Sequence, residues 1–119
     1  EQYNHNITQL FHDHDFRASV MGIGEDGHTA GLLAGFENYW DINKLVVGYE
    51  NSEKFKNRIS ITPGAIQQLN YAMIVLAGES KRRVLERFIQ SSEIDTVNDF
   101  PAKIIHKIPK IDIFTDIKI

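Results

Sequence analysis

An acid and an imidazole, Asp26 and His28, stand two positions apart in a stretch that also contains Gly22, Gly24 and Gly27. Histidine changes its charge near neutral pH and can act as a general base, and a neighbouring carboxylate can orient it or hold a nucleophilic water. Glycine tolerates positive φ and lets a ligand approach the backbone closely. A purely structural turn does not need this acid and imidazole together, so the stretch is a candidate ligand-binding loop.

The elements on either side of the loop suggest how it would be positioned. Residues 17–23 predict a short apolar strand, and the chain from Thr29 onward predicts a helix. The start of a helix leaves unpaired N–H groups and a partial positive charge. We therefore expect the loop to receive an anion or a developing oxyanion, with N–H donors around Gly24 and Gly27.

Two other interpretations of the loop stay open. Its three glycines match the GxGxxG spacing of dinucleotide-binding loops. A second expected strand, residues 44–49, is followed by Glu50, but this acid lies further from the first glycine than a ribose-binding acid does. Glu25 and Asp26 would also repel a pyrophosphate. The dinucleotide interpretation is therefore disfavoured, and a plain structural turn with incidental polar residues is the third alternative.

Composition limits the class of protein. A chain of 119 residues with 42% apolar residues can form the core of one domain. The net charge of −3 and the pI near 5.9 argue against a general nucleic-acid binder. The lack of cysteine fits a reducing cytoplasm, and no apolar run or leader predicts a membrane segment. Because the first residue is Glu1 rather than methionine, we expect a piece of a longer protein.

Strand and helix signals alternate along the chain. Thr62 should cap a helix that Pro63 opens and that ends near residue 70, because proline at the first helical position lacks only an N–H that would be unpaired anyway. Further helices are expected from Ser80 and from Pro101. Strands are expected at residues 17–23, 44–49, 58–62, 71–77 and 111–117. This order predicts an α/β fold with a mainly parallel sheet flanked by helices, in a single domain of residues 1–119.

The N-terminal segment predicts a short amphipathic helix capped by Asn6 and followed by the polar run His12, Asp13, His14 and Asp15. In an extended segment both imidazoles would lie on one side, as a metal site requires. Two histidines without a third ligand make a poor closed site, so a solvated loop is favoured and no metal is expected.

Residues 71–77 are almost continuously apolar, which is typical of a central parallel strand covered on both faces. The helix expected after this strand has Lys81, Arg82 and Arg83 in its first turn, where the helix dipole disfavours cations by about a few tenths of a kcal/mol each. A bound phosphate would offset this cost. Lys81 is therefore a candidate phosphate ligand, with three solvated basic residues as the alternative.

Two stretches resemble one enzyme family. GIGEDGHTAGLLAG, residues 22–35, is similar to the GxGxDGHTAS motif of 6-phosphogluconolactonases, which are related in fold to glucosamine-6-phosphate deaminases. RISITPGAIQQLNYAMIVLAGESK, residues 58–81, is similar to the R(I/V)TLT…LN.A..V….G..K segment of the same family. The resemblance covers most of residues 17–90 and implies a Rossmann-like fold. The family's N-terminal half, with its own glycine-rich phosphate loop and a substrate-binding arginine, has no counterpart here.

The resemblance implies hydrolysis of 6-phosphogluconolactone to 6-phosphogluconate in the oxidative pentose phosphate pathway, without a cofactor. His28 would activate water, Asp26 would orient His28 or hold the water, and Lys81 with Arg58 would hold the phosphate. The related deaminases carry a glutamate five residues after the histidine, where this chain has Leu33. Leucine cannot move a proton, so the lactonase branch is favoured over the deaminase branch.

Three alternatives stay open. The chain could be a deaminase-like enzyme, a non-catalytic sugar-phosphate-binding fragment, or a piece whose missing N-terminal half completes the site. The expected partners are accordingly a phosphorylated sugar lactone and that missing half, with no nucleic acid and no membrane. The expected location is the cytoplasm.

Overall fold

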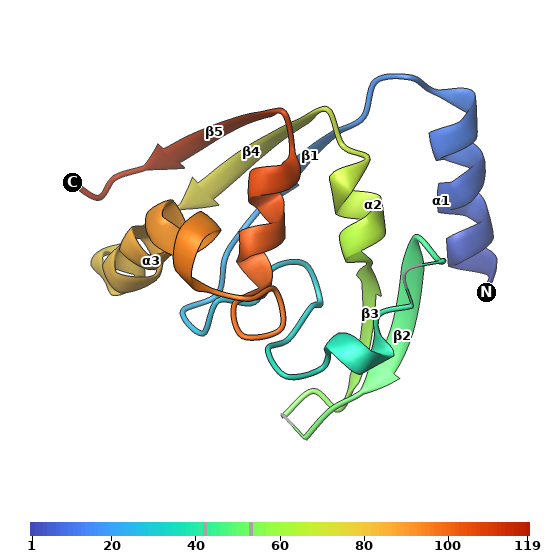
Figure 1. Cartoon of the computed structure of the whole chain (residues 1–119), viewed down its shortest axis with the longest axis horizontal. Helices are drawn as coiled ribbons and strands as arrows, with labels where there is room; N and C mark the ends of the chain where they lie inside the picture. Colours follow the sequence, from blue (N-terminus) through green and yellow to red (C-terminus); the bar gives the residue numbers. More distant parts are fainter. Residues whose placement is uncertain (42, 53) are drawn as a thin grey trace.

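The computed structural model describes residues 1–41, 43–52 and 54–119, which form a three-stranded sheet, a two-stranded sheet and short helices (Figure 1). The elements in chain order are α1 (Gln2–Asp13), β1 (Ala18–Met21), η1 (Glu37–Tyr39), β2 (Val46–Glu50), β3 (Asn57–Ile61), α2 (Pro63–Gln67), β4 (Tyr71–Leu76), η2 (Glu79–Lys81), α3 (Arg82–Ile94), η3 (Pro101–Lys107) and β5 (Lys110–Thr115). The α/β fold expected from the sequence is confirmed.

The larger sheet has the order β1-β4-β5, and both pairs of neighbours are parallel. The apolar strand β4 is central, as its sequence predicts. Parallel neighbours need long crossovers. Everything from the glycine loop to α2 lies in the first crossover, and α3 and η3 form the second.

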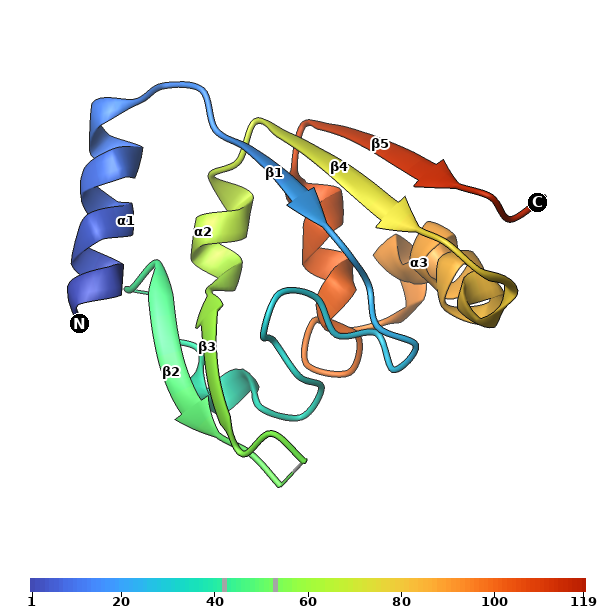
Figure 2. The same ribbon diagram turned by 180° about the vertical axis from the view of Figure 1, so that it is seen from behind.

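All helices that cover this sheet lie on one side of it (Figures 1 and 2). Ala72, Ile74 and Leu76 of β4 point to that side and are buried, whereas Val75 is exposed on the other side. The expectation that β4 is covered on both faces is therefore wrong for this chain. The physical reason is that α2, α3 and η3 all pack on the same face, and no other described element covers the opposite one.

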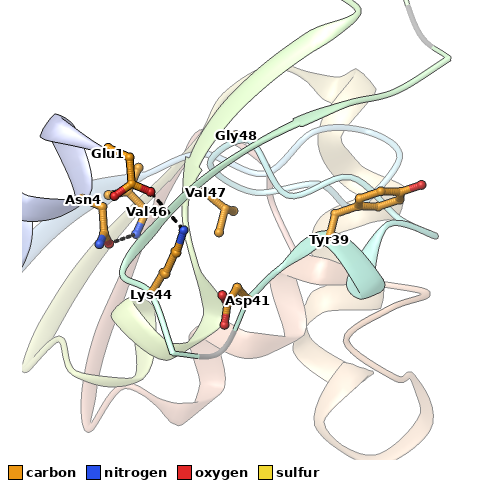
Figure 3. A pocket seen from close by; sticks show the side chains of 8 residues that line it. All are labelled: Glu1, Asn4, Tyr39, Asp41, Lys44, Val46, Val47 and Gly48. Atoms are coloured by element: carbon orange, nitrogen blue, oxygen red, sulfur yellow. Dashed lines mark hydrogen bonds and ion pairs between the residues drawn. The ribbon is translucent and has the colours of Figure 1, made fainter.

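The smaller sheet is the antiparallel pair β2 and β3, with Val46 opposite Ile61. Both strands were expected, but not their separation from the parallel sheet. Helix α1 packs against β2. The side-chain oxygen of Asn4 accepts the N–H of Leu45 at 2.9 Å and that of Val46 at 2.9 Å, and Figure 3 shows the bond to Val46.

Helix α1 begins earlier than predicted. Its N-cap position is Glu1, and Asn6 lies inside the helix, where it accepts a bond from Gln2. His12 and Asp13 belong to the last turn of the helix rather than to an extended segment. Among the described residues no group of three or more metal-binding side chains gathers anywhere.

The predicted cap of α2 is confirmed, because Thr62 accepts the N–H of Ala65 at 3.1 Å and Pro63 follows it. The helix ends at Gln67, slightly earlier than expected.

Between the helices and the sheet lies the core, with Phe88 and Phe100 as its largest fully buried side chains. Burying a side chain of this size contributes about 1.5–3 kcal/mol. None of the helices in the described part of the chain is long and apolar enough to cross a membrane.

Candidate functional site

The glycine loop leaves β1 after Met21 but does not start a helix at Thr29, so that prediction is wrong. Ala30 has φ 50° and Gly35 has φ 88°, values that an α-helix does not contain. The N–H of Leu32 donates to the carbonyl of Thr29 across a tight turn instead. After the loop, the first helical segment is η1. The partial positive charge expected from a helix beginning at Thr29 is therefore absent from this loop.

Hydrogen bonds to the smaller sheet replace those of the expected helix. The N–H of Gly31 donates to Ser60 Oγ at 2.9 Å. The hydroxyl of Tyr49 donates to the Gly31 carbonyl at 2.5 Å and accepts the N–H of Leu33 at 3.0 Å. A Cβ on Gly31 would lie 2.9 Å from the carbonyl oxygen of Ile59, so this residue must be glycine for the segment to lie against β3.

Asp26 and His28 form the pair that the sequence predicted. Nδ1 of His28 lies 2.5 Å from Oδ1 of Asp26, and the same oxygen accepts the backbone N–H of His28 at 3.1 Å. The His28 side chain is 35% exposed and that of Asp26 is 65% exposed. Partial burial raises the pKa of Asp26, but the bonds from the ring and backbone of His28 outweigh this effect and hold the pKa below its usual value. Asp26 is therefore a carboxylate that fixes one ring nitrogen of His28.

Two glycines of the loop lie in close contact with aromatic rings. A Cβ on Gly24 would lie 2.1 Å from the His28 ring, so the imidazole rests directly on this residue. Gly27 has φ 91°, and a Cβ there would lie 2.2 Å from the ring of Phe100. Their N–H groups are already engaged, with the His28 carbonyl at 2.8 Å and the Gly24 carbonyl at 2.8 Å respectively. The expectation that these two N–H groups serve as oxyanion donors is therefore not supported by the geometry.

A cavity of about 360 Å³ opens beside the pair. The described residues that line it are Gly22, Ile23, Gly24, His28, Ala30 and Lys81. Lys81 reaches it from η2, and its Nζ donates to the Ile23 carbonyl at 2.7 Å. An ammonium group has three donors, so this bond leaves two for an anion. The cavity lies where β1 and β4 end, the edge at which open parallel sheets bind ligands.

Gly22 lines this cavity without being required by the backbone. A Cβ added there would meet no atom within 4 Å. The residue also holds the loop, because its carbonyl accepts the hydroxyl of Thr29 at 2.9 Å. Gly22 therefore leaves space open in the cavity, whereas Gly24 lets the His28 ring lie directly against the backbone.

Two predicted substrate contacts lie elsewhere. Gly27 is buried against Phe100, and it is not one of the described residues that line the cavity. Arg58 is also outside it, on β3 opposite Tyr49, with its guanidinium 6.0 Å from the centre of the Phe55 ring. The structure thus brings together Asp26, His28, Lys81 and two of the three glycines, but not Arg58.

Another cavity, of about 310 Å³, lies between α1, η1 and β2 (Figure 3). It contains none of the site residues that the sequence predicted. Its cation, Lys44, already forms an ion pair with Glu1 at 3.2 Å. The cavity beside His28 therefore stays the candidate functional site.

Sequence reasoning did not identify the support beneath the loop. Phe100 packs against Gly27, and the N–H of Ala102 donates to the Gly27 carbonyl at 3.0 Å. The guanidinium of Arg87 lies 4.3 Å from the centre of the Phe100 ring. Ala30, whose positive φ is unusual for a residue with a side chain, is a further lining residue that was missed. In a single sequence nothing in the types or spacing of these residues links them to the loop.

A comparison with known families gives this site its context. The family described as "Glucosamine-6-phosphate isomerases/6-phosphogluconolactonase" matches residues 1–112. This chain belongs to that family. The 6-phosphogluconolactonase of Borreliella burgdorferi is 32% identical to it, with 98% of this chain and 48% of the relative covered. The glucosamine-6-phosphate deaminase of Lysinibacillus sphaericus is 26% identical, with 92% of this chain and 53% of the relative covered.

Solved structures show the same fold. The 6-phosphogluconolactonase of Thermotoga maritima matches with a TM-score of 0.74 and 21% identity, covering 96% of this chain and 48% of that protein. The enzyme of Plasmodium vivax matches with a TM-score of 0.79 and 14% identity, covering 96% of this chain and 50% of that protein. The chain therefore spans about half the length of these relatives.

Proposed function

We propose that this chain supplies the acid–imidazole part of a 6-phosphogluconolactonase site, which hydrolyses 6-phosphogluconolactone to 6-phosphogluconate. The observation that carries the proposal is that His28, oriented by Asp26, and the cation of Lys81 line one cavity at the end of the parallel sheet. The family match and the curated relatives named 6-phosphogluconolactonase support the substrate class.

His28 is the proposed base. Its Nδ1 is bonded to Asp26, so Nε2 would accept a proton from water while the water oxygen attacks the lactone carbonyl carbon. The carbonyl electrons move onto its oxygen. When the tetrahedral intermediate collapses, the bond to the ring oxygen breaks and Nε2 returns the proton to that oxygen. The products are a hydroxyl and a carboxyl group, and the Asp26 carboxylate stabilises the imidazolium between the two steps.

Lys81 is the proposed phosphate ligand. The Lys81 residue is half-buried and its ammonium donates to the Ile23 carbonyl. The positive charge is therefore fixed at the cavity. Arg58 would contact the substrate only if the substrate extended beyond this cavity.

The cytoplasmic location expected from the sequence stays a prediction.

Two substrates separate the candidate activities. We expect the purified chain, alone or combined with the missing half of the fold, to hydrolyse 6-phosphogluconolactone faster than the spontaneous reaction, measured as 6-phosphogluconate formed. Release of ammonia from glucosamine 6-phosphate, with no lactone hydrolysis, would instead assign the deaminase activity. Leu33 favours the first outcome, because it is buried and has no ionisable group.

The non-catalytic alternative needs a binding measurement. Calorimetric titration with 6-phosphogluconate reports occupancy of the cavity without requiring turnover. Binding together with hydrolysis supports the proposal. Binding without hydrolysis, in the chain alone and with the missing half, would assign a sugar-phosphate-binding role.

A further inference from the structure

The chain between α3 and η3 lies against the glycine loop (Figures 1 and 2). Phe100 is fully buried there, and a Cβ on Gly27 would lie 2.2 Å from its ring. Two positions further along, the N–H of Ala102 donates to the Gly27 carbonyl at 3.0 Å. Gly27 is therefore held by both a ring and a backbone hydrogen bond, although it is not one of the described residues that line the cavity.

The geometry of the acid–imidazole pair depends on Gly27. One oxygen of Asp26 accepts the backbone N–H of His28 at 3.1 Å and lies 2.5 Å from Nδ1 of the same residue. The bond to the backbone closes an Asx turn across Gly27, whose φ of 91° is uncommon for residues with a side chain. Rotation of this backbone unit would break the turn and move the ring away from the carboxylate. The contacts that fix Gly27 therefore also fix the pair.

Arg87 holds Phe100 from helix α3. Its guanidinium lies 4.3 Å from the centre of the Phe100 ring, a distance typical of a cation–π contact. Nη2 and Nε of Arg87 also donate to the two carboxylate oxygens of Asp95, at 2.9 Å and 3.2 Å, and paired bonds of this kind fix the plane of a guanidinium. These bonds hold the pKa of Asp95 below its usual value, so the carboxylate stays charged at neutral pH.

We propose that Phe100, held by Arg87, is a positioning residue for the acid–imidazole pair. Neither side chain is among the described ones that line the cavity, so neither is a catalytic residue. Phe100 fixes the backbone at Gly27. The neutral imidazole of His28 then keeps its proton on Nδ1, which donates to Asp26, and Nε2 remains the base. The expected effect on turnover rests on the proposed function, but the position of the ring proton can be measured without it.

The ring proton is observed directly by ¹⁵N NMR. In a neutral imidazole the protonated and the unprotonated nitrogen differ widely in chemical shift, so the spectrum gives the fraction of each tautomer. The signals of His28 are identified by their loss in His28→Ala. Phe100→Leu removes the ring that contacts Gly27 but keeps an apolar side chain in the core. Phe88 is equally buried, but its ring stacks on His106, so Phe88→Leu is the matched control.

Arg87→Met is a milder change that leaves the core filled, and it decides the question if Phe100→Leu does not fold. Arg82 also forms an ion pair on helix α3, with Glu79, and its side chain is 37% exposed against 44% for Arg87. Its guanidinium donates to Glu79 and to the Lys118 carbonyl, so Arg82→Met is the control for this change. All variants are compared in the purified chain, alone and combined with the missing half of the fold.

We expect wild type and both controls to carry the proton mainly on Nδ1 of His28. In Phe100→Leu and Arg87→Met the tautomer with the proton on Nε2 should appear as well. Their turnover of 6-phosphogluconolactone should fall at least about tenfold with KM near wild type, because a misplaced base slows the chemical step.

Tautomer fractions equal to wild type in either folded variant would overturn the proposal. The same change of tautomer in Phe88→Leu would also overturn it, because the effect would then follow from any loss of core packing. If wild type itself does not hydrolyse the lactone, the proposed function fails, whereas the tautomer fractions still decide whether Phe100 positions the imidazole.

Discussion

At the scale of single residues, the site depends on a few close contacts around one imidazole. Asp26 holds Nδ1 of His28, and Gly24 supplies the flat surface under the ring. The sequence predicted that Asp26 would pair with His28 and that Lys81 would lie near them, and the structure has this arrangement. The catalytic and phosphate-binding roles stay predictions. The sequence could not predict that the N–H groups of Gly24 and Gly27 are used within the loop, since that depends on the path of the backbone.

Gly22 and Gly24 are expected to respond differently to alanine. In Gly24→Ala the new methyl overlaps the partly exposed His28 ring, which should displace the base and destabilise the fold by about 1 kcal/mol. In Gly22→Ala the methyl meets no neighbour, so the free energy of unfolding should change by less than about 0.5 kcal/mol. The added methyl would narrow the cavity and weaken binding of 6-phosphogluconate. Urea unfolding and calorimetry check both variants, and equal stabilities would refute the contact at Gly24.

The phosphate assignment is tested by a pair of neighbouring cations. Lys81→Met keeps most of the side-chain volume but removes the charge at the cavity, so the affinity for 6-phosphogluconate should fall by at least about tenfold, as expected for a charge-assisted hydrogen bond. Arg83 is exposed and does not line the cavity, so Arg83→Met is the matched control. If both variants lost the same affinity for 6-phosphogluconate, Lys81 would act only through the overall charge of the protein and not as a phosphate ligand.

Acid pH should act on the site through Asp26. Its pKa is lowered in the folded chain, so its contribution to stability is complete above the ordinary aspartate pKa and is lost as the pH falls through the lowered value. Asp26→Asn removes this titrating group. The variant should therefore lose less stability between neutral and acid pH than the wild type. The difference should be small, because the Asp26 carboxylate is largely exposed to solvent that screens its charge. Unfolding free energies measured between neutral and acid pH, compared between the two proteins, check the sign.

At the scale of elements, the strands and the later helices follow from local patterns, but the segment after the glycine loop does not. Its apolar residues match a helix, yet Ala30 and Gly35 take positive φ. The segment bonds to Tyr49 and Ser60, which lie far along the chain. Long-range hydrogen bonds of this kind override local preference and leave no periodic signal.

Tyr49 should therefore stabilise the loop through its hydroxyl. Tyr49→Phe leaves the ring in place but removes the group that bridges Gly31 and Leu33, which should cost about 1–3 kcal/mol because a buried N–H loses its acceptor. Tyr39 stacks on Tyr49 and its side chain is exposed, so Tyr39→Phe is the control and should be near neutral. Comparable unfolding free energies for the two variants would contradict the bridging role.

At the scale of the whole molecule, the chain carries a complete inner core, and no described element covers the outer face of its parallel sheet. The α/β class and the central position of β4 were predictable from the order of elements. The uncovered face was not, because the apolar sequence of β4 predicts a strand covered on both sides, whereas α2, α3 and η3 all pack on one side. The chain spans about half the length of the relatives that it matches, and within it His28, bonded to Asp26, lines one cavity with Lys81.

The most direct test of the central claim is the rate of 6-phosphogluconolactone hydrolysis by the chain combined with the missing half, compared between wild type and His28→Ala. A positioned base contributes roughly 10²–10⁴-fold, so the turnover of His28→Ala should fall by that order while circular dichroism and binding of 6-phosphogluconate stay near wild type. Glu25→Ala, next to the pair and exposed, should keep the wild-type rate. A His28→Ala turnover equal to wild type would remove the imidazole from the mechanism and contradict the proposed function of this site.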